Sequence, residues 1–198
     1  MTFDDLKVQL ADWLSNTDIF GKAELLIQLA EARHKRDVRI REMLTRSALT
    51  VDDRYISLPD GFLEMRTLRL LTNPVTVLSE INLHEMNRVR VETTGKPTRF
   101  TVHTQIEFDK SPDTSYSGEI IFYKELTPLS SSNATNALLD RALDVYLYGA
   151  LLAAEAFLQN DERIAVWAAQ YTSAVERLNA VDRKRAGPLI ARVLGATP

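Results

Sequence analysis

Apolar positions recur at helical spacing at both ends of the chain and alternate with polar positions in the middle. At the N-terminal end, this spacing predicts a helix over about 3–15, which Thr2 and Asp5 cap, and a second helix over about 22–45. Beyond a joint rich in Ser, Thr and Asn at 129–136, it predicts a third helix over about 135–159. A fourth helix follows, capped by Asp161 and ending near 183–187.

The distribution of prolines and of short apolar runs in the middle of the chain is typical of a β-rich segment. No proline precedes Pro59, five occur from Pro59 to Pro128 inclusive, and none follows until Pro188. Short apolar or alternating runs predict strands at 55–58, 65–71, 75–78, 99–102, 106–108 and 119–123. A short helix at about 82–88 interrupts them. We therefore expect an α+β fold, an antiparallel helical bundle of N- and C-terminal helices with an inserted antiparallel β-rich subdomain, divided as 1–50, 51–128 and 129–198.

The third helix is apolar on two faces. Its main face includes Leu139, Tyr146 and Phe157, and a second face about half a turn away carries Val145, Tyr148 and Leu152. A helix that is apolar nearly all round is buried on both sides, within a core or between subunits. This pattern makes the second face a candidate contact between copies of the chain.

Composition removes several classes of protein. The 198 residues are enough for one domain with an insertion. The chain has 24 Lys+Arg and 27 Asp+Glu, and its net charge of −3 gives no general attraction to nucleic acid. Zero cysteines exclude disulfides, thiolate metal sites and a cysteine nucleophile. The N-terminus has no secretory signal pattern, and the longest apolar run, 145–158, is too short for a bilayer span and contains Glu155. We expect no membrane association.

The sequence offers little catalytic chemistry. Its three histidines, His34, His84 and His103, are not spaced as metal ligands on one element, and the adjacent pair His84 and Glu85 comes with no nucleophile. The seven glycines are scattered singly, so no phosphate-binding loop is present. We expect no enzyme activity, no metal and no cofactor.

The predicted second helix is rich in basic residues, Arg33, Lys35, Arg36, Arg39, Arg41 and Arg46. One interpretation is a surface for nucleic-acid phosphates, and the favoured one is a helix laced with salt bridges to nearby acids. Arg33 and Asp37 differ because they fall within the apolar stripe. They are predicted to form a buried pair or to meet charges on a neighbouring chain.

The C-terminal stretch is locally basic. Arg183, Lys184, Arg185 and Arg192 stand against Asp182. These charges either complement the helix dipole or form a tail that docks on an acidic partner.

Several stretches, taken in order, resemble the head-to-tail adaptor (connector) proteins of short-tailed bacteriophages. They are LAE at 29–31 with Arg33 and Arg36, LPDGFLE at 58–64, GKPTRF at 95–100, PLS at 128–130 running to 135–136, DVYLYGAL at 144–151 and DER at 161–163. None is a catalytic motif, and the resemblance depends on their combined order.

The resemblance implies a virion protein at the head–tail interface, in a dodecameric ring on the portal protein, with nozzle and fibre proteins of the tail on the other side. A ring needs heterologous interfaces, and the face with Val145, Tyr148 and Leu152 suits one. The family's C-terminal segment reaches the portal, which would give the basic tail a partner. The ring encloses the DNA path, and net charge −3 implies a weakly repulsive channel without specific nucleic-acid binding.

Overall fold

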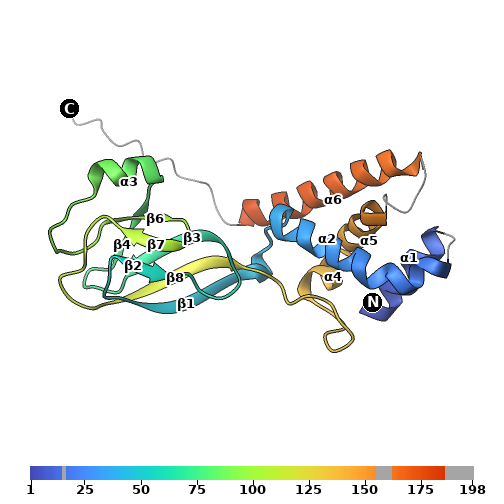
Figure 1. The fold of residues 1–198 in the computed structure, drawn as a ribbon, viewed down its shortest axis with the longest axis horizontal. Helices are drawn as coiled ribbons and strands as arrows, with labels where there is room; N and C mark the ends of the chain where they lie inside the picture. Colours follow the sequence, from blue (N-terminus) through green and yellow to red (C-terminus); the bar gives the residue numbers. More distant parts are fainter. Residues whose placement is uncertain (15–16, 155–161, 186–198) are drawn as a thin grey trace. The chain divides into compact units, whose positions relative to one another are not determined.

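The protein divides into two compact units, described here from a computed structural model that covers residues 1–14, 17–154 and 162–185 (Figure 1). The helical unit comprises Met1–Arg41 and Leu126–Pro198, and the β unit comprises Glu42–Glu125. The β unit is thus inserted into the sequence of the helical unit, and the fold class is α+β.

The helical unit contains helices from both ends of the chain. Its N-terminal part holds α1 (Phe3–Leu14), the 3₁₀ helix η1 (Thr17–Lys22) and α2 (Ala23–Asp37), and its C-terminal part holds α4 (Ala137–Arg141), α5 (Leu143–Ala153) and α6 (Arg163–Arg185). The predicted cap of α1 is confirmed, since Asp5 N–H donates to Thr2 Oγ1 at 3.2 Å and Thr2 N–H donates to Asp5 Oδ2 at 2.8 Å.

The core of the helical unit lies around α5, which packs against both α2 and α6. Leu26, Ile27, Val145 and Leu151 are fully buried there, and Trp167 of α6 is nearly so. On α2 the buried apolar positions Ala23, Leu26, Ile27 and Ala30 follow the helical spacing i, i+3, i+4, i+7, so the hydrophobic effect fixes which face of this helix turns inward.

The predicted second helix is too long. Helix α2 ends at Asp37, and Val38 is already extended, with φ −103° and ψ 130°. Leu44 then begins a strand, β1 (Leu44–Val51), that sequence analysis missed. Ile40 and Leu44 are four residues apart and so continue the helical spacing. The conformation of Leu44 is decided by the pairing of β1 with a strand about 70 residues further on, because Leu44 faces Tyr123 and Val51 faces Tyr116.

The predicted third helix is broken at Ala142. This residue has φ −147° and ψ 71°, which ends α4 and precedes α5. The part of the prediction over 155–159 lies outside the described residues. The fourth helix is confirmed as α6, and its predicted cap, Asp161, also lies outside the described residues.

The β unit contains two sheets of four strands each. The first has the order β1–β8–β3–β4, with β8 at Tyr116–Lys124, β3 at Phe62–Leu70 and β4 at Thr76–Val77. The second has the order β2–β7–β6–β5, with β2 at Tyr55–Ser57, β7 at Gln105–Phe108, β6 at Arg99–Val102 and β5 at Ser79–Glu80. The six predicted strands are confirmed as β2, β3, β4, β6, β7 and β8, whereas β1 and β5 were not predicted. The strand pairs in the two sheets are antiparallel except β5 with β6, which is parallel.

One apolar core joins the two sheets. Leu68 and Ile120 come from the first sheet, and Phe100, Ile106 and Phe108 from the second. The predicted short helix is confirmed as α3 (Leu83–Val89), where the Asn82 side chain accepts from Glu85 N–H at 2.9 Å. Gly61, with φ +70°, supplies the left-handed turn residue that leads into β3.

Candidate interaction surfaces and polar core of the helical unit

A buried carboxylate holds the segment that returns from the β unit. Glu31 of α2 accepts from Leu129 N–H at 2.7 Å and from Tyr146 OH at 3.0 Å. Asn136 Nδ2 donates to the same tyrosine oxygen at 2.6 Å and caps α4 with its side-chain oxygen. Burial raises the pKa of Glu31 although both hydrogen bonds lower it, and burial also raises the pKa of Tyr146.

His34, one turn further along α2, sits in a tight apolar site. Its Nε2 lies 3.3 Å from Val145 O, and because a carbonyl only accepts, Nε2 carries the proton and Nδ1 does not. Among the described residues, Nδ1 has no hydrogen-bond partner. Burial lowers the pKa of His34 to about 4. A Cβ at Gly149 would lie 2.9 Å from Nε2, so glycine provides the space that the imidazole ring occupies.

The chain leaving the helical unit is held by α6. Asn179 Oδ1 accepts from Arg39 N–H and Asp182 Oδ2 accepts from Arg41 N–H, both at 2.9 Å. Arg141 adds a bidentate pair to Asp182 at 2.8 Å for each contact. Burial alone would raise the pKa of Asp182, but the hydrogen bonds from Arg141 and Arg41 hold it below its usual value. Both connections to the β unit are therefore anchored by buried polar groups.

The prediction of a buried pair of Arg33 and Asp37 is wrong. Asp37 is exposed and accepts from Tyr171 OH at 3.1 Å, and Arg33 is half-buried with its guanidinium 5.6 Å from the centre of the same ring. The buried face of α2 includes Glu31 and His34 and does not include Arg33 or Asp37. Contact of Arg33 and Asp37 with a neighbouring chain stays a prediction.

The three apolar residues predicted to face a neighbouring copy have different environments. Val145 is fully buried and Leu152 nearly so, and Tyr148 is half-buried, edge-on to Trp13 at a centroid distance of 6.3 Å. The second face of α5 is thus covered largely by the chain's own residues. Val145 offers no surface to a neighbour in this arrangement, and the predicted contact is not tested by a single chain.

The basic residues are less concentrated than predicted. Helix α2 carries Arg33, Lys35 and Arg36, whereas Arg39 and Arg41 follow it and Arg46 lies on β1, paired with Glu119 at 3.5 Å. The prediction of one continuous Arg-rich helix is therefore wrong. In the C-terminal tail, Arg183, Lys184 and Arg185 form the last turn of α6, and Arg192 lies outside the described residues. Docking of this tail stays a prediction.

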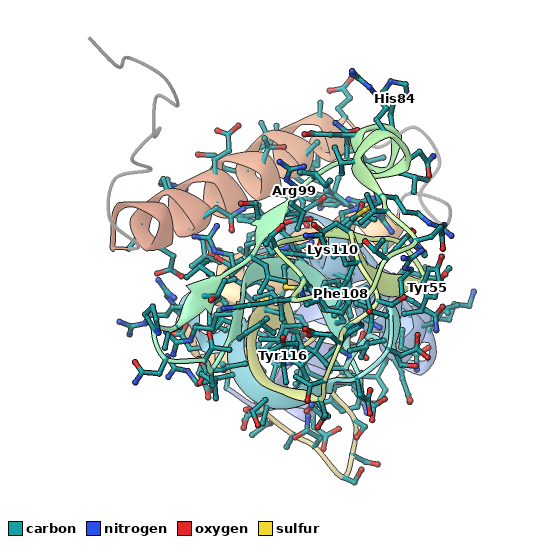
Figure 2. All side chains as sticks on the ribbon, turned by 90° about the vertical axis from the view of Figure 1, so that its left-hand side faces the viewer. Tyr55, His84, Arg99, Phe108, Lys110 and Tyr116 are labelled. Atoms are coloured by element: carbon teal, nitrogen blue, oxygen red, sulfur yellow. The ribbon has the colours of Figure 1, made fainter. Side chains whose placement is uncertain are left out.

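The residues most open to a catalytic interpretation lie on the surface of the β unit. A depression is lined by Asn82, His84, Glu85, Arg88 and Val89, all from α3 and its cap, and Figure 2 shows His84 projecting from that helix, apart from Tyr55, Phe108 and Tyr116. No nucleophile lines this depression. In the part of the chain that the structure describes, no group of three or more His, Cys, Asp or Glu side chains could hold a metal ion. Among the described residues, no helix has the length and apolar character that a bilayer span requires.

Sequence analysis missed Glu31 and His34. A usable signal exists, because Ile27, Ala30, Glu31 and His34 follow the spacing i, i+3, i+4, i+7 of a buried stripe. The signal was not decisive, because the partners Leu129, Tyr146 and Val145 come from the distant C-terminal part of the chain.

The described residues combine a helical unit, an inserted β unit and buried polar groups that hold both connections between them. The comparison with protein families gives the class: the model described as SU10 adaptor protein matches residues 1–192. The chain therefore belongs to the SU10 adaptor protein family, a family of phage head-to-tail adaptors. The resemblance found in the sequence is confirmed. A comparison with curated proteins gives no match.

Proposed function

We propose that the protein is a non-enzymatic part of the phage virion that joins the portal to the tail as a dodecameric ring. The observation that carries this proposal is the family match over residues 1–192. The polar anchors of the helical unit are compatible with it, because they give the helical unit a defined structure at the two points where the chain leaves and re-enters it. In this proposal the helices of the helical unit form an antiparallel bundle, supported by the packing of α5 against α2 and α6.

The two ends of the adaptor have different partners in this proposal. The basic C-terminal tail, with Arg183, Lys184, Arg185 and Arg192, docks on the portal protein, and nozzle and fibre proteins of the tail bind the opposite side. DNA passes through the ring without being gripped, since the chain carries 27 acidic against 24 basic residues. The alternative, a regulator that binds nucleic acid through a basic second helix, loses support because those basic residues are divided among α2, the segment after it and β1.

The test is light scattering coupled to size exclusion on the chain alone and mixed with the portal protein of the same phage, at low and high salt. We expect a defined mixed ring. Replacing Arg183, Lys184 and Arg185 by Gln should weaken it, whereas Gln at Arg66, Arg88 and Lys124, three exposed cations of the β unit, should not. A folded chain that binds the portal at neither salt concentration would refute the proposal, and DNA binding that falls steeply with salt would favour the alternative.

A further inference from the structure

Helix α2 carries a second stripe on its solvent-exposed side. Leu25 and Leu29 are 49% and 48% exposed, although large apolar side chains usually face a core. We call this stripe the α2 strip, and its five exposed members are Lys22, Leu25, Leu29, Ala32 and Arg36. Their spacing of 3, 4, 3 and 4 residues is the spacing of a seam between two packed helices. Lys22, the N-cap, has helical backbone angles and so continues the stripe.

Helix α6 carries a matching stripe. Val166 is 58% exposed, and it lies in a row of exposed residues spaced 4, 3, 4 and 3 apart. We call this row the α6 strip, and its members are Glu162, which directly precedes α6, and Val166, Ala169, Ser173 and Glu176 of the helix. Its centre is small, so another helix can approach closely there.

The two strips are complementary in shape, length and charge. The α2 strip has large leucines between two cations, and the α6 strip has small residues between two anions. In both strips the charged ends are 14 positions apart in the sequence, Lys22 to Arg36 and Glu162 to Glu176, which is about 21 Å along a helix. Each cation therefore meets an anion whichever way the two helices run.

The two cations that directly follow the anions of the α6 strip have contacts within their own helix. Arg177 follows Glu176, but its Nε donates to Ser173 O of its own helix at 3.2 Å, and Arg163 lies over the ring of Trp167 at 5.1 Å. Arg36 donates to Ala32 O at 3.0 Å through Nη1 alone, and a guanidinium has four further N–H donors.

The signs of the charges at the ends of the strips also determine which strips can pair. Two α2 strips brought together would place cation on cation, and two α6 strips would place anion on anion. Only the pairing of unlike strips satisfies both ends. Such a contact is heterologous, and a heterologous contact repeated from copy to copy closes into a ring when the rotation permits.

We propose that the α2 strip of one copy docks on the α6 strip of the next copy. This inference rests on the proposed function, because it names the lateral contact of the ring, and it adds residues that neither the family match nor the sequence analysis assigned. Electrostatic attraction at the ends sets the register, and the leucines supply the apolar contact. A single pair of helices makes a small interface, so self-association should be weak in the isolated chain and strengthened on the portal.

The absence of cysteine makes a cross-linking test clean. Leu29 and Ala169 are the central residues of their strips, so they meet in either helix direction. The variants Leu29→Cys and Ala169→Cys, carrying tags of different mass, are mixed and oxidised, both alone at high concentration and with the portal protein. We expect a mixed disulfide dimer at about tenfold the yield of an Asp12→Cys and Ala169→Cys control, which uses an exposed residue of α1. A chain with both L29C and A169C should give ladders longer than a dimer.

Charge exchange then tests the register. Lys22→Glu with Arg36→Glu in the Leu29→Cys chain should abolish the mixed dimer, and Glu162→Lys with Glu176→Lys in its Ala169→Cys partner should restore it. Cross-linking equal to the control under both conditions, dimers from either single-cysteine variant alone, or no rescue by the exchange would overturn the inference. If the portal complex forms normally without this cross-link, the adaptor function stands and only the assigned interface is wrong.

Discussion

The buried histidine of α2 makes acid sensitivity a measurable property of the fold. Burial lowers the pKa of His34 from 6.5 to about 4, with Arg33 acting in the same direction and the hydrogen bond to Val145 O and the charge of Asp37 acting against it. The unfolded chain therefore binds a proton that the folded chain rejects at any pH between these values. Stability from this group is complete above about pH 6.5 and is lost as the pH falls towards about 4.

The magnitude follows from the shift. One pKa unit corresponds to about 1.4 kcal/mol, so the full loss is about 3 kcal/mol, of which about 2 kcal/mol has occurred by pH 5. Glu31 acts in the opposite direction, because its raised pKa makes the folded state bind its proton more readily than the unfolded state as the pH falls. The contribution of His34 must therefore be isolated by a difference between variants.

The assay is urea unfolding of the wild-type chain and of His34→Gln at several pH values from about 7.5 to about 5. His34→Gln should be less stable than wild type near neutral pH, and the gap should close by about 2 kcal/mol on acidification, because glutamine has no proton to gain. His84→Gln, at an exposed position on α3, serves as the control and should follow the wild-type pH dependence. Parallel pH profiles for wild type and His34→Gln would refute the reasoning.

Three further substitutions test individual contacts by denaturant unfolding. Tyr146→Phe removes a hydroxyl that donates to Glu31 and accepts from Asn136, so it should cost about 2 kcal/mol, and a loss within error would show that the network is not coupled to folding. Asp182→Ala removes the acceptor of Arg141 and Arg41 N–H and should cost about 2 kcal/mol, with a negligible effect expected for the exposed Glu176→Ala on the same helix. Gly61→Ala places a Cβ at φ +70° and should cost about 1 kcal/mol, more than Gly95→Ala, whose Cβ would meet its nearest neighbour at an ordinary 3.5 Å.

Elements whose own sequence carries a clear apolar stripe or a capping pair could be predicted. Helix α1 has Thr2 and Asp5 at its start, and α6 has a single stripe from Trp167 to Leu178. These signals lie within the element itself or directly beside it. Local spacing therefore carried enough information.

The elements and contacts that could not be predicted share one physical cause: their local structure depends on a partner that is distant in the sequence. Strand β1 forms because β8 pairs with it along its whole length, and β5 contains only two residues, beside β6. The same holds for the candidate site: Glu31 has its partners 98 and 115 residues away. A charged residue on a helix suggests a solvated face unless these partners are known.

The buried carboxylates Glu31 and Asp182 explain how the helical unit keeps a defined structure although the β unit interrupts its sequence. The chain leaves the helical unit at Arg41, whose N–H donates to Asp182, and it is held again at Leu129, whose N–H donates to Glu31. An apolar contact at these points would tolerate a shift along the chain, because it is not directional. A hydrogen bond from a particular backbone N–H to a buried carboxylate does not, since a shift by one residue leaves that carboxylate without its donor. The hydrogen bonds to Glu31 and Asp182 thus offset part of the desolvation of the two carboxylates, and they also fix which residue of each connecting segment lies at the helical unit.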